Sequence, residues 1–208
     1  MKLRFLIASG PTREPIDPVR YLSNYSTGTM GRFLAEAVKK RGHKLDWVRC
    51  PEEAESARDL EKVLTQRLAS ADVLVMAAAV CDARPKAVSA KKIKKDKFDS
   101  IKLVKNPDIL AGLAKKKKSS QVFVGFALES QDLFKNALSK LKRKSLDLIV
   151  LQRVTKNIKP FGDQSIEAFL IKKDQSQNVF ESIGKKKLAE IIVREAEKLV
   201  RDSRNPFC

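Results

Sequence analysis

The chain has 208 residues and a formal net charge of +18, from 43 Lys and Arg against 25 Asp and Glu. This length suits a single domain covering residues 1–208, and an apolar share of 43% excludes an intrinsically disordered chain. The longest uncharged apolar run, from Val73 to Cys81, is far shorter than the roughly 20 residues of a membrane-spanning helix. We therefore expect a globular protein that does not enter a membrane.

The histidine and cysteine content excludes several kinds of catalytic and metal site. The three cysteines are scattered, without metal-binding spacing, and no signal peptide precedes the first apolar run. These features predict a reduced, cytoplasmic protein. The only histidine, His43, excludes a His-dependent catalytic triad and a His-rich metal site.

The positive charge is concentrated in three segments. Residues 86–105 carry a net charge of +6, residues 115–118 carry +4, and residues 133–146 carry +5. A solvated lysine-rich surface, a nucleic acid and an anionic small molecule could each account for such clustering.

The first half of the chain alternates between strands and helices. Prolines 11, 15 and 18 keep the segment after the first strand from being helical. The apolar spacing predicts, in order, a strand over Leu3–Ala8, a helix over Thr29–Lys40, a strand over Leu45–Val48, a helix over Leu60–Leu68 and a strand over Val73–Ala79. This β-α-β-α-β order favours a parallel sheet.

The second half continues the pattern after an interruption. Residues 82–104 are rich in lysine and lack periodicity, which predicts a mobile loop. After it we expect a helix from Asn106-Pro107-Asp108 to about Lys116, a strand over Val122–Phe126, a helix over Gln131–Lys144, a strand over Leu146–Leu151, an antiparallel appendage over 152–183 that could contribute a dimer contact, and a helix over Lys185–Val200. The fold class is α/β: a three-layer, Rossmann-like parallel sheet with helices on both faces and a small antiparallel appendage.

Two segments could bind an anion or a polar ligand. Small and hydroxyl residues from Ser23 to Gly31 open the first helix, where backbone N–H groups can face an anion, or where Ser26 or Thr27 can simply cap the helix. Asp82 ends an apolar strand and could hold a cation or a polar ligand group, or could serve as a turn residue.

Lysines supply further candidates for an anion site. Lys92 lies in the lysine-rich loop, where it could close over phosphates. Lys140 and Lys144 are four residues apart on one helix face beside an apolar stripe, so they could border a pocket or remain plain surface residues.

Several motifs, in order along the chain, carry a specific resemblance. They are Gly10–Gly31 (GPTREPIDPVRYLSNYSTGTMG), Ala78–Asp82, Lys92–Lys95, Lys105–Ile109, Gly125–Ala127 and Arg143–Ile149. Together they resemble the bacterial phosphopantothenoylcysteine synthetase family, which often forms the C-terminal half of a bifunctional coenzyme A biosynthesis flavoprotein. The resemblance covers nearly the whole chain, and the 22-residue opening is its most specific part.

The resemblance implies a ligase reaction. Members of this family join 4′-phosphopantothenate to L-cysteine with CTP and Mg²⁺, through an acyl-cytidylate that the cysteine amine converts into an amide. It also implies a homodimer, and a lysine-rich, histidine-poor site suits charge neutralisation without a protein nucleophile. Because the first strand begins close to Met1, we expect a stand-alone synthetase that binds no flavin.

The resemblance also implies residue roles, position by position. Asn24 and Lys92 match catalytic residues, and Asp82 is in addition a candidate for the metal. The implied nucleotide site is Ala78, Asp82, Lys92, Pro107, Asp108, Ile109, Leu110, Phe126, Lys140 and Lys144. The implied site for phosphopantothenate and the intermediate is Arg20, Asn24, Ser26, Gly28, Gly31, Ala78 and Ala79, with Arg20 acting across a dimer interface.

The chain departs from the family pattern at three places, and two other functions remain as alternatives. Cys81 replaces a small residue, Gln152-Arg153-Val154 replaces Asn-Asp-Val, and Ser165 replaces an asparagine. The βαβ opening and Arg49 suggest an NADP-dependent oxidoreductase, but the 17 residues between Gly10 and Gly28 fit a dinucleotide motif poorly. The charge suggests a nucleic-acid-binding module, for which Phe98 is the only aromatic residue in the basic stretch.

Overall fold

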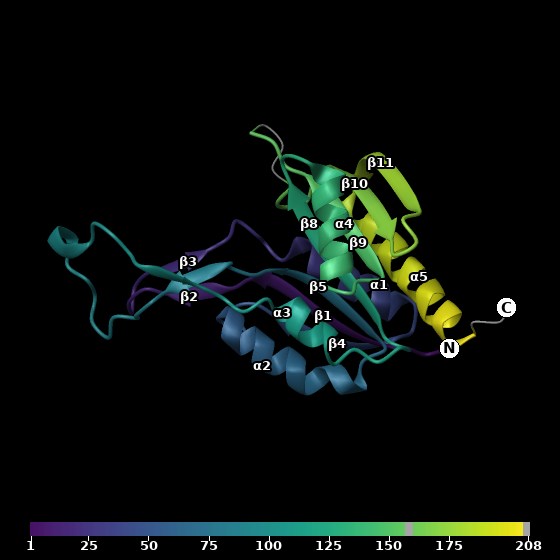
Figure 1. Cartoon of the computed structure of the whole chain (residues 1–208), viewed down its shortest axis with the longest axis horizontal. Helices are drawn as coiled ribbons and strands as arrows, with labels where there is room; N and C mark the ends of the chain where they lie inside the picture. Colours follow the sequence, from purple (N-terminus) through teal and green to yellow (C-terminus); the bar gives the residue numbers. More distant parts are fainter. Residues whose placement is uncertain (157–159, 206–208) are drawn as a thin grey trace.

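The computed structural model describes residues 1–156 and 160–205, and its centre is a seven-stranded sheet (Figure 1). The strand order is β11-β10-β9-β8-β5-β1-β4. In chain order, these strands are β1 (Arg4–Pro11), β4 (Lys44–Arg49), β5 (Val73–Ala79), β8 (Val122–Glu129), β9 (Leu148–Arg153), β10 (Ser165–Lys172) and β11 (Gln177–Gly184). The strands from β9 to β4 are parallel, so the predicted parallel α/β sheet is confirmed.

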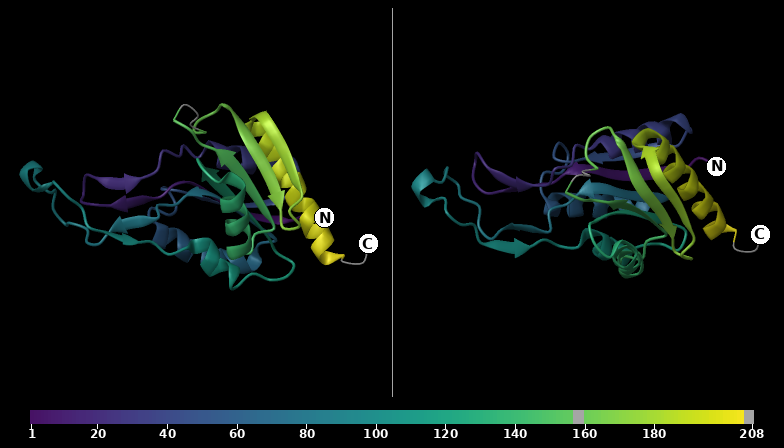
Figure 2. Two further views of the ribbon diagram at one scale, coloured as in Figure 1. Left: turned by 45° about the horizontal axis from the view of Figure 1, so that its top comes forward. Right: turned by 90° about the horizontal axis from the view of Figure 1, so that it is seen from above.

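Helices cover both faces of the sheet (Figure 2). Alternation along β1 sends Phe5 and Ile7 to one face and Leu6 and Ala8 to the other. The first face packs against α1 (Thr29–Lys40) and α5 (Lys185–Arg204), and the second packs against α2 (Ala57–Arg67), α3 (Ile109–Ala114) and α4 (Leu133–Arg143). The three layers follow from this division of apolar side chains.

The antiparallel pair expected within 152–183 is present, but it belongs to the main sheet. β10 forms an antiparallel ladder along β9, and β11 pairs antiparallel with β10. The predicted appendage is therefore the edge of the same sheet, because the buried residues Phe169 and Ile171 continue its core. Residues 157–159 of that segment, and Cys208 at the end of the chain, lie outside the described residues.

Four short strands were not expected from the sequence. β2 (Arg13–Pro15) and β3 (Tyr21–Ser23) form a hairpin in the proline-rich connection, and β6 (Ala83–Pro85) pairs with β7 (Leu103–Lys105) at the base of the lysine-rich loop. Pro15 and Pro85 are tolerated because each lies at the end of a two-stranded ribbon.

The lysine-rich loop projects from the sheet. Figure 1 and both views of Figure 2 show the connection between β6 and β7, hereafter the arm (residues 86–102), running outward beside the β2–β3 hairpin. A hydrogen bond from Ser89 N to Ile16 O (3.0 Å) joins the two. Two 3₁₀ turns, η1 (Leu68–Ser70) and η2 (Lys95–Lys97, at the tip of the arm), complete the elements. Within the described part of the chain, none of the helices is long and apolar enough to cross a membrane.

Candidate active site

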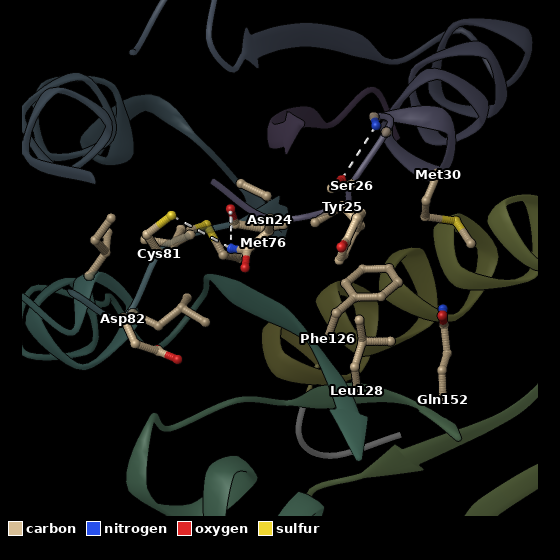
Figure 3. Close-up of a pocket in the computed structure, with 18 of the residues that line it drawn as sticks. Asn24, Tyr25, Ser26, Met30, Met76, Cys81, Asp82, Phe126, Leu128 and Gln152 are labelled. Carbon is tan, nitrogen blue, oxygen red and sulfur yellow. Dashed lines mark hydrogen bonds between the residues drawn. The ribbon is translucent and has the colours of Figure 1, made fainter. Parts of the chain in front are cut away.

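A pocket of about 710 Å³ lies at the carboxyl ends of the parallel strands (Figure 3). Its lining comes from the start of α1, the ends of β5, β8 and β9, the start of α3, the last turn of α4 and the first residue of α5. Ligands of open α/β sheets gather at this edge, and the volume is in the range of small-molecule sites.

The start of α1 presents its backbone to the pocket. Gly28 is the N-cap, with a φ of 73°, and no side chain caps the helix, so the alternative of a cap by Ser26 or Thr27 does not apply. At Gly31, an added Cβ would lie 2.0 Å from Ser9 Cβ, so only glycine allows the helix to approach β1 this closely. The first N–H groups of a helix without a side-chain cap favour an anion.

Asn24 is held at one end of the pocket. Its side-chain amide donates to the carbonyl of Ala79 (3.1 Å) and, more weakly, to Cys81 Sγ (3.9 Å), as Figure 3 shows. Behind this pair, the fully buried Thr12 accepts a hydrogen bond from Cys81 N through its Oγ1 (3.0 Å). Thr12 also accepts one from Ser23 Oγ at its carbonyl (2.7 Å). Thr12 therefore fixes the segments before Asn24 and after Ala79 to each other.

Burial determines the state of the Cys81 thiol. Cys81 is 5% exposed, and burial raises its pKa above the ordinary value. A thiol with a raised pKa is a poor nucleophile at neutral pH. Cys81 is therefore a small packing residue of the pocket wall rather than a reactive one.

The opposite wall is built around α3 and α4. Asp108 caps α3 by accepting a hydrogen bond from Ala111 N (3.2 Å), and it forms an ion pair with Lys144 (2.9 Å). Burial raises the pKa of Asp108, but the hydrogen bonds from Lys144 and Ala111 outweigh it and hold the pKa below its usual value. Lys140 forms an ion pair with Glu129 of β8 (2.7 Å). Both lysines of this helix face are therefore paired with carboxylates.

Asn106 joins the two walls. Its side-chain amide donates to the carbonyl of Cys81 (2.9 Å), and its backbone N donates to the carbonyl of Asp82 (2.8 Å). Asp82 itself is exposed and lines the pocket. Asn106 thereby fixes the position of Asp82 relative to α3.

The far end of the pocket contains residues that were not among the expected site residues, although Gln152 was noted as a departure from the family pattern. Gln152, Pro160, Phe161 and Lys185 line it, near Met30 and Phe126. Lys185 lies in a run of three lysines, and nothing in that run distinguishes a buried lysine from its exposed neighbours. The sequence also did not indicate Glu129 as the partner of Lys140, because Glu129 lies beyond the expected end of its strand.

Most of the site residues expected from the sequence meet in this pocket. Those that line it are Asn24, Ser26, Gly28, Gly31, Ala78, Ala79, Asp82, Pro107, Asp108, Ile109, Leu110, Phe126, Lys140 and Lys144. They come from segments more than 100 residues apart, so the fold brings together what the sequence motifs only suggested.

Arg20 and Lys92 lie outside the pocket lining. Lys92 is exposed on the arm. The guanidinium of Arg20 pairs with Asp17, donates to the carbonyl of Ile93 (2.7 Å) and lies 3.7 Å from the ring centre of Phe98. Arg20 therefore attaches the arm to the hairpin.

Comparison with known proteins identifies the family. Residues 1–199 match the family described as the DNA/pantothenate metabolism flavoprotein C-terminal domain. The chain belongs to this family. The match covers nearly the whole chain, as the resemblance of the motifs implied.

Two curated relatives and one solved structure illustrate the similarity. A cysteine/cysteine sulfinic acid decarboxylase from an unknown prokaryotic organism is 39% identical over 95% of this chain and 58% of its own. The coenzyme A biosynthesis bifunctional protein CoaBC of Escherichia coli strain K12 is 34% identical over 94% of this chain and 53% of its own. The chain thus spans a little over half the length of these relatives.

The similarity extends to the fold. The crystal structure of the C-terminal domain of a coenzyme A biosynthesis bifunctional protein CoaBC superposes with a TM-score of 0.81 and 30% identity. That alignment covers 97% of this chain and 99% of the other. The mixed sheet described above is therefore the fold of that domain.

Proposed function

We propose that this chain is a phosphopantothenate–cysteine ligase of coenzyme A biosynthesis that uses CTP. The observation that carries the proposal is the convergence of the family motifs, from Asn24 to Lys144, on one pocket in a chain of this family. The carboxylate of 4′-phosphopantothenate would attack the α-phosphate of CTP and release pyrophosphate. The amine of L-cysteine would then attack the acyl carbon, lose a proton and displace CMP.

The pocket residues suit this chemistry without a protein nucleophile. Two highly charged substrates must be held side by side, which requires donors and cations more than an attacking side chain. The amide of Asn24 and the uncapped N-terminus of α1 supply donors, and Lys140 and Lys144 supply cations. Asn24 would hold the acyl-cytidylate, and α3 with Phe126 would hold the nucleotide.

The donor chemistry also fits Mg²⁺ arriving with the triphosphate. The described residues contain no group of three or more metal-ligating side chains, but Mg²⁺ commonly uses one or two carboxylates together with substrate phosphates. Asp82, exposed in the pocket, would be that carboxylate. The ion would supply neutralisation of phosphate charge.

We further propose that the chain acts as a homodimer through the hairpin and the arm. Exposed apolar side chains occur on the hairpin at Tyr21 (49% exposed), on the arm at Val88 (59%) and at the base of the arm at Leu103 of β7 (52%). Arg20 and Lys92 lie on these same segments, outside their own pocket. Their roles in catalysis would then be performed in the pocket of the partner protomer.

The remaining expectations stay predictions. We expect a cytoplasmic protein that binds no flavin, needs no membrane and has no specific nucleic-acid partner. The family assignment gives no support to the NADP-dependent oxidoreductase or to the nucleic-acid-binding module.

Pyrophosphate release tests the proposal directly. Purified protein is given phosphopantothenate with CTP or ATP, in the presence and absence of cysteine, and pyrophosphate and amide product are measured. We expect both products with CTP and cysteine. Absence of turnover with phosphopantothenate, or turnover with ATP alone, would refute the assigned reaction or the assigned nucleotide, respectively.

A further inference from the structure

Lys185 is the most deeply buried cation of the pocket lining. It begins α5 and is only 4% exposed, whereas the adjacent Lys186 and Lys187 are exposed. Its ammonium donates to the carbonyls of Pro160 (2.8 Å) and Gly162. Both acceptors are neutral, so the buried charge has hydrogen bonds but no counter-ion among them.

The other pocket lysines are in a different situation. Lys140 is paired with Glu129 and Lys144 with Asp108, whereas the ion pairs of residues 1–156 and 160–205 do not include Lys185. Burial lowers the pKa of Lys185, as expected when a charged group loses water, and outweighs the opposite effect of the Asp163 charge, which forms no ion pair with it. A buried charge without a counter-ion in direct contact is costly, and a bound anion would offset that cost.

Among residues 1–156 and 160–205, Lys185 has hydrogen-bond acceptors for two of its three donors. An ammonium has three N–H donors, and two of them are used by the carbonyls of Pro160 and Gly162. Lys185 lines the same pocket as the uncapped start of α1 at Thr29, Met30 and Gly31. A cation and free helix N–H groups in one pocket are the donor set of a phosphate site.

We propose that Lys185 binds a phosphoryl group of substrate and is a specificity-determining residue of the pocket. The ligand is a phosphate-bearing anion, either the triphosphate of the nucleotide or the phosphate of phosphopantothenate. This inference rests on the proposed function for the identity of the substrates. Binding would also stabilise the wall at Pro160 and Gly162, because the same ammonium holds both.

Three variants test the proposal in the intact chain. Lys185→Met removes the charge and keeps most of the apolar stem, and Lys185→Arg keeps the charge. Lys186→Met removes one charge from the exposed neighbour and serves as the matched control. For each variant, kcat and KM are measured separately for CTP, phosphopantothenate and cysteine, together with the unfolding temperature.

We expect Lys185→Met to raise KM for one phosphate-bearing substrate by about 10- to 100-fold, the usual loss for a charge-assisted hydrogen bond. KM for cysteine should stay within about twofold, and Lys185→Arg should recover most of the loss. A rise confined to CTP assigns the triphosphate, and a rise confined to phosphopantothenate assigns its phosphate. Unchanged values, or a uniform change in all three, would overturn the proposal in favour of a purely structural lysine.

A second measurement does not depend on how the variant folds. In wild-type protein with ¹⁵N-labelled lysine, the ammonium resonance of Lys185 is followed while inorganic pyrophosphate, inorganic phosphate or each substrate is added. We expect the resonance to shift with at least one phosphate-bearing ligand, and its indifference to all of them would overturn the inference. An inactive wild-type protein whose Lys185 still responds would instead refute the proposed function alone.

Discussion

The ammonium of Lys140 lies 2.7 Å from a carboxylate oxygen of Glu129, so the charge of this pocket cation is already paired within the protein. An anionic ligand that uses Lys140 must compete with Glu129. A pair of this kind, with the Lys140 side chain 33% exposed, is worth about 0.2–1 kcal/mol.

Glu129→Gln should therefore strengthen nucleotide binding. Removing the competing charge is expected to lower KM for CTP by about two- to fivefold, with kcat little changed. Steady-state kinetics at constant ionic strength measures this. Glu36→Gln, which removes a carboxylate from an exposed pair on α1, is the control and should leave KM unchanged. An increase in KM for CTP would mean that Glu129 positions Lys140 rather than competing with the nucleotide for it.

Asn24→Ala should abolish most turnover while the protein remains folded. The Asn24 side chain is exposed in the pocket, and its hydrogen bond to the carbonyl of Ala79 is exposed as well, so its loss removes a donor for the proposed acyl-cytidylate at little structural cost. Loss of one such donor typically slows turnover by about 10²- to 10³-fold. Rapid-quench measurement of acyl-cytidylate and amide would locate the affected step. Asn178→Ala, on the exposed face of β11, is a control that should keep full activity.

Lys92→Ala should severely slow amide formation. Mixing this variant with a second inactive variant should show whether Lys92 acts in the pocket of its own protomer or in that of its partner. We expect an equimolar mixture of Lys92→Ala and Asn24→Ala chains, after subunit exchange, to regain about a quarter of wild-type activity, since half of the dimers are then mixed and each has one intact site. Lys94→Ala is the control on the same arm and should stay active. A mixture that remains inactive after proven exchange would place Lys92 in the pocket of its own protomer.

Gly31→Ala should distort the pocket. The new methyl group would lie 2.0 Å from Ser9 Cβ, so α1 must move away from β1. We expect a loss of stability of about 1–3 kcal/mol, as for overpacking of a core, and weaker binding of both phosphate-bearing substrates. Gly112→Ala is the matched helical control, because its methyl group would meet its nearest neighbour at 3.7 Å. That variant should gain about 0.5–1 kcal/mol from helix propensity. Equal unfolding free energies for the two variants would contradict the packing argument.

Glu197 should make the stability of the protein depend on acid pH. Burial raises the pKa of Glu197, but hydrogen bonds from Arg41 and His43 outweigh it and hold the pKa below the ordinary value of 4.5. The folded pKa is depressed, so the stabilisation is present above about pH 4.5 and is lost as the pH falls through the folded pKa.

Glu197→Gln isolates this contribution. Urea unfolding from about pH 3 to pH 7 should show a loss of about 1.5–3 kcal/mol at neutral pH that shrinks toward acid. Glu36→Gln should lower stability by less than about 0.5 kcal/mol at every pH, because its pair is exposed. A loss for Glu197→Gln that is constant with pH would contradict the linkage.

Periodicity predicted the elements that bury a continuous apolar stripe. The bounds of α1 and β5 agree with the predicted Thr29–Lys40 and Val73–Ala79, because each buries most of one face or both. The β2–β3 hairpin was not predicted because its three-residue strands are too short to show an alternating apolar pattern. They are stabilised by contacts between residues separated in the sequence, such as the hydrogen bond from Ser23 to Thr12.

Only the site residues that belong to the family motifs could be predicted from the sequence. Residues within recognisable motifs, such as Asp108 and Lys144, converge as expected. Lys185 could not be selected, because its burial at the start of α5 is not revealed by the sequence, and Gln152 was noted only as a departure from the family pattern. The sequence also could not show that Lys92 lies outside the pocket, because the order of motifs along the chain does not reveal the direction in which a projecting segment extends.

The described side chains of the arm belong to neither hydrophobic cluster of the sheet. Most of its sequence can therefore change while the core of the sheet stays intact, whereas loss of the Phe98 ring or displacement of the Ile93 carbonyl would weaken its attachment to Arg20 of the hairpin. Under the proposed function, nucleotide recognition by the pocket and the supply of Lys92 by the arm would then be separable properties of the chain. The arm would accordingly be the segment in which turnover can change without altering the pocket that selects the substrates.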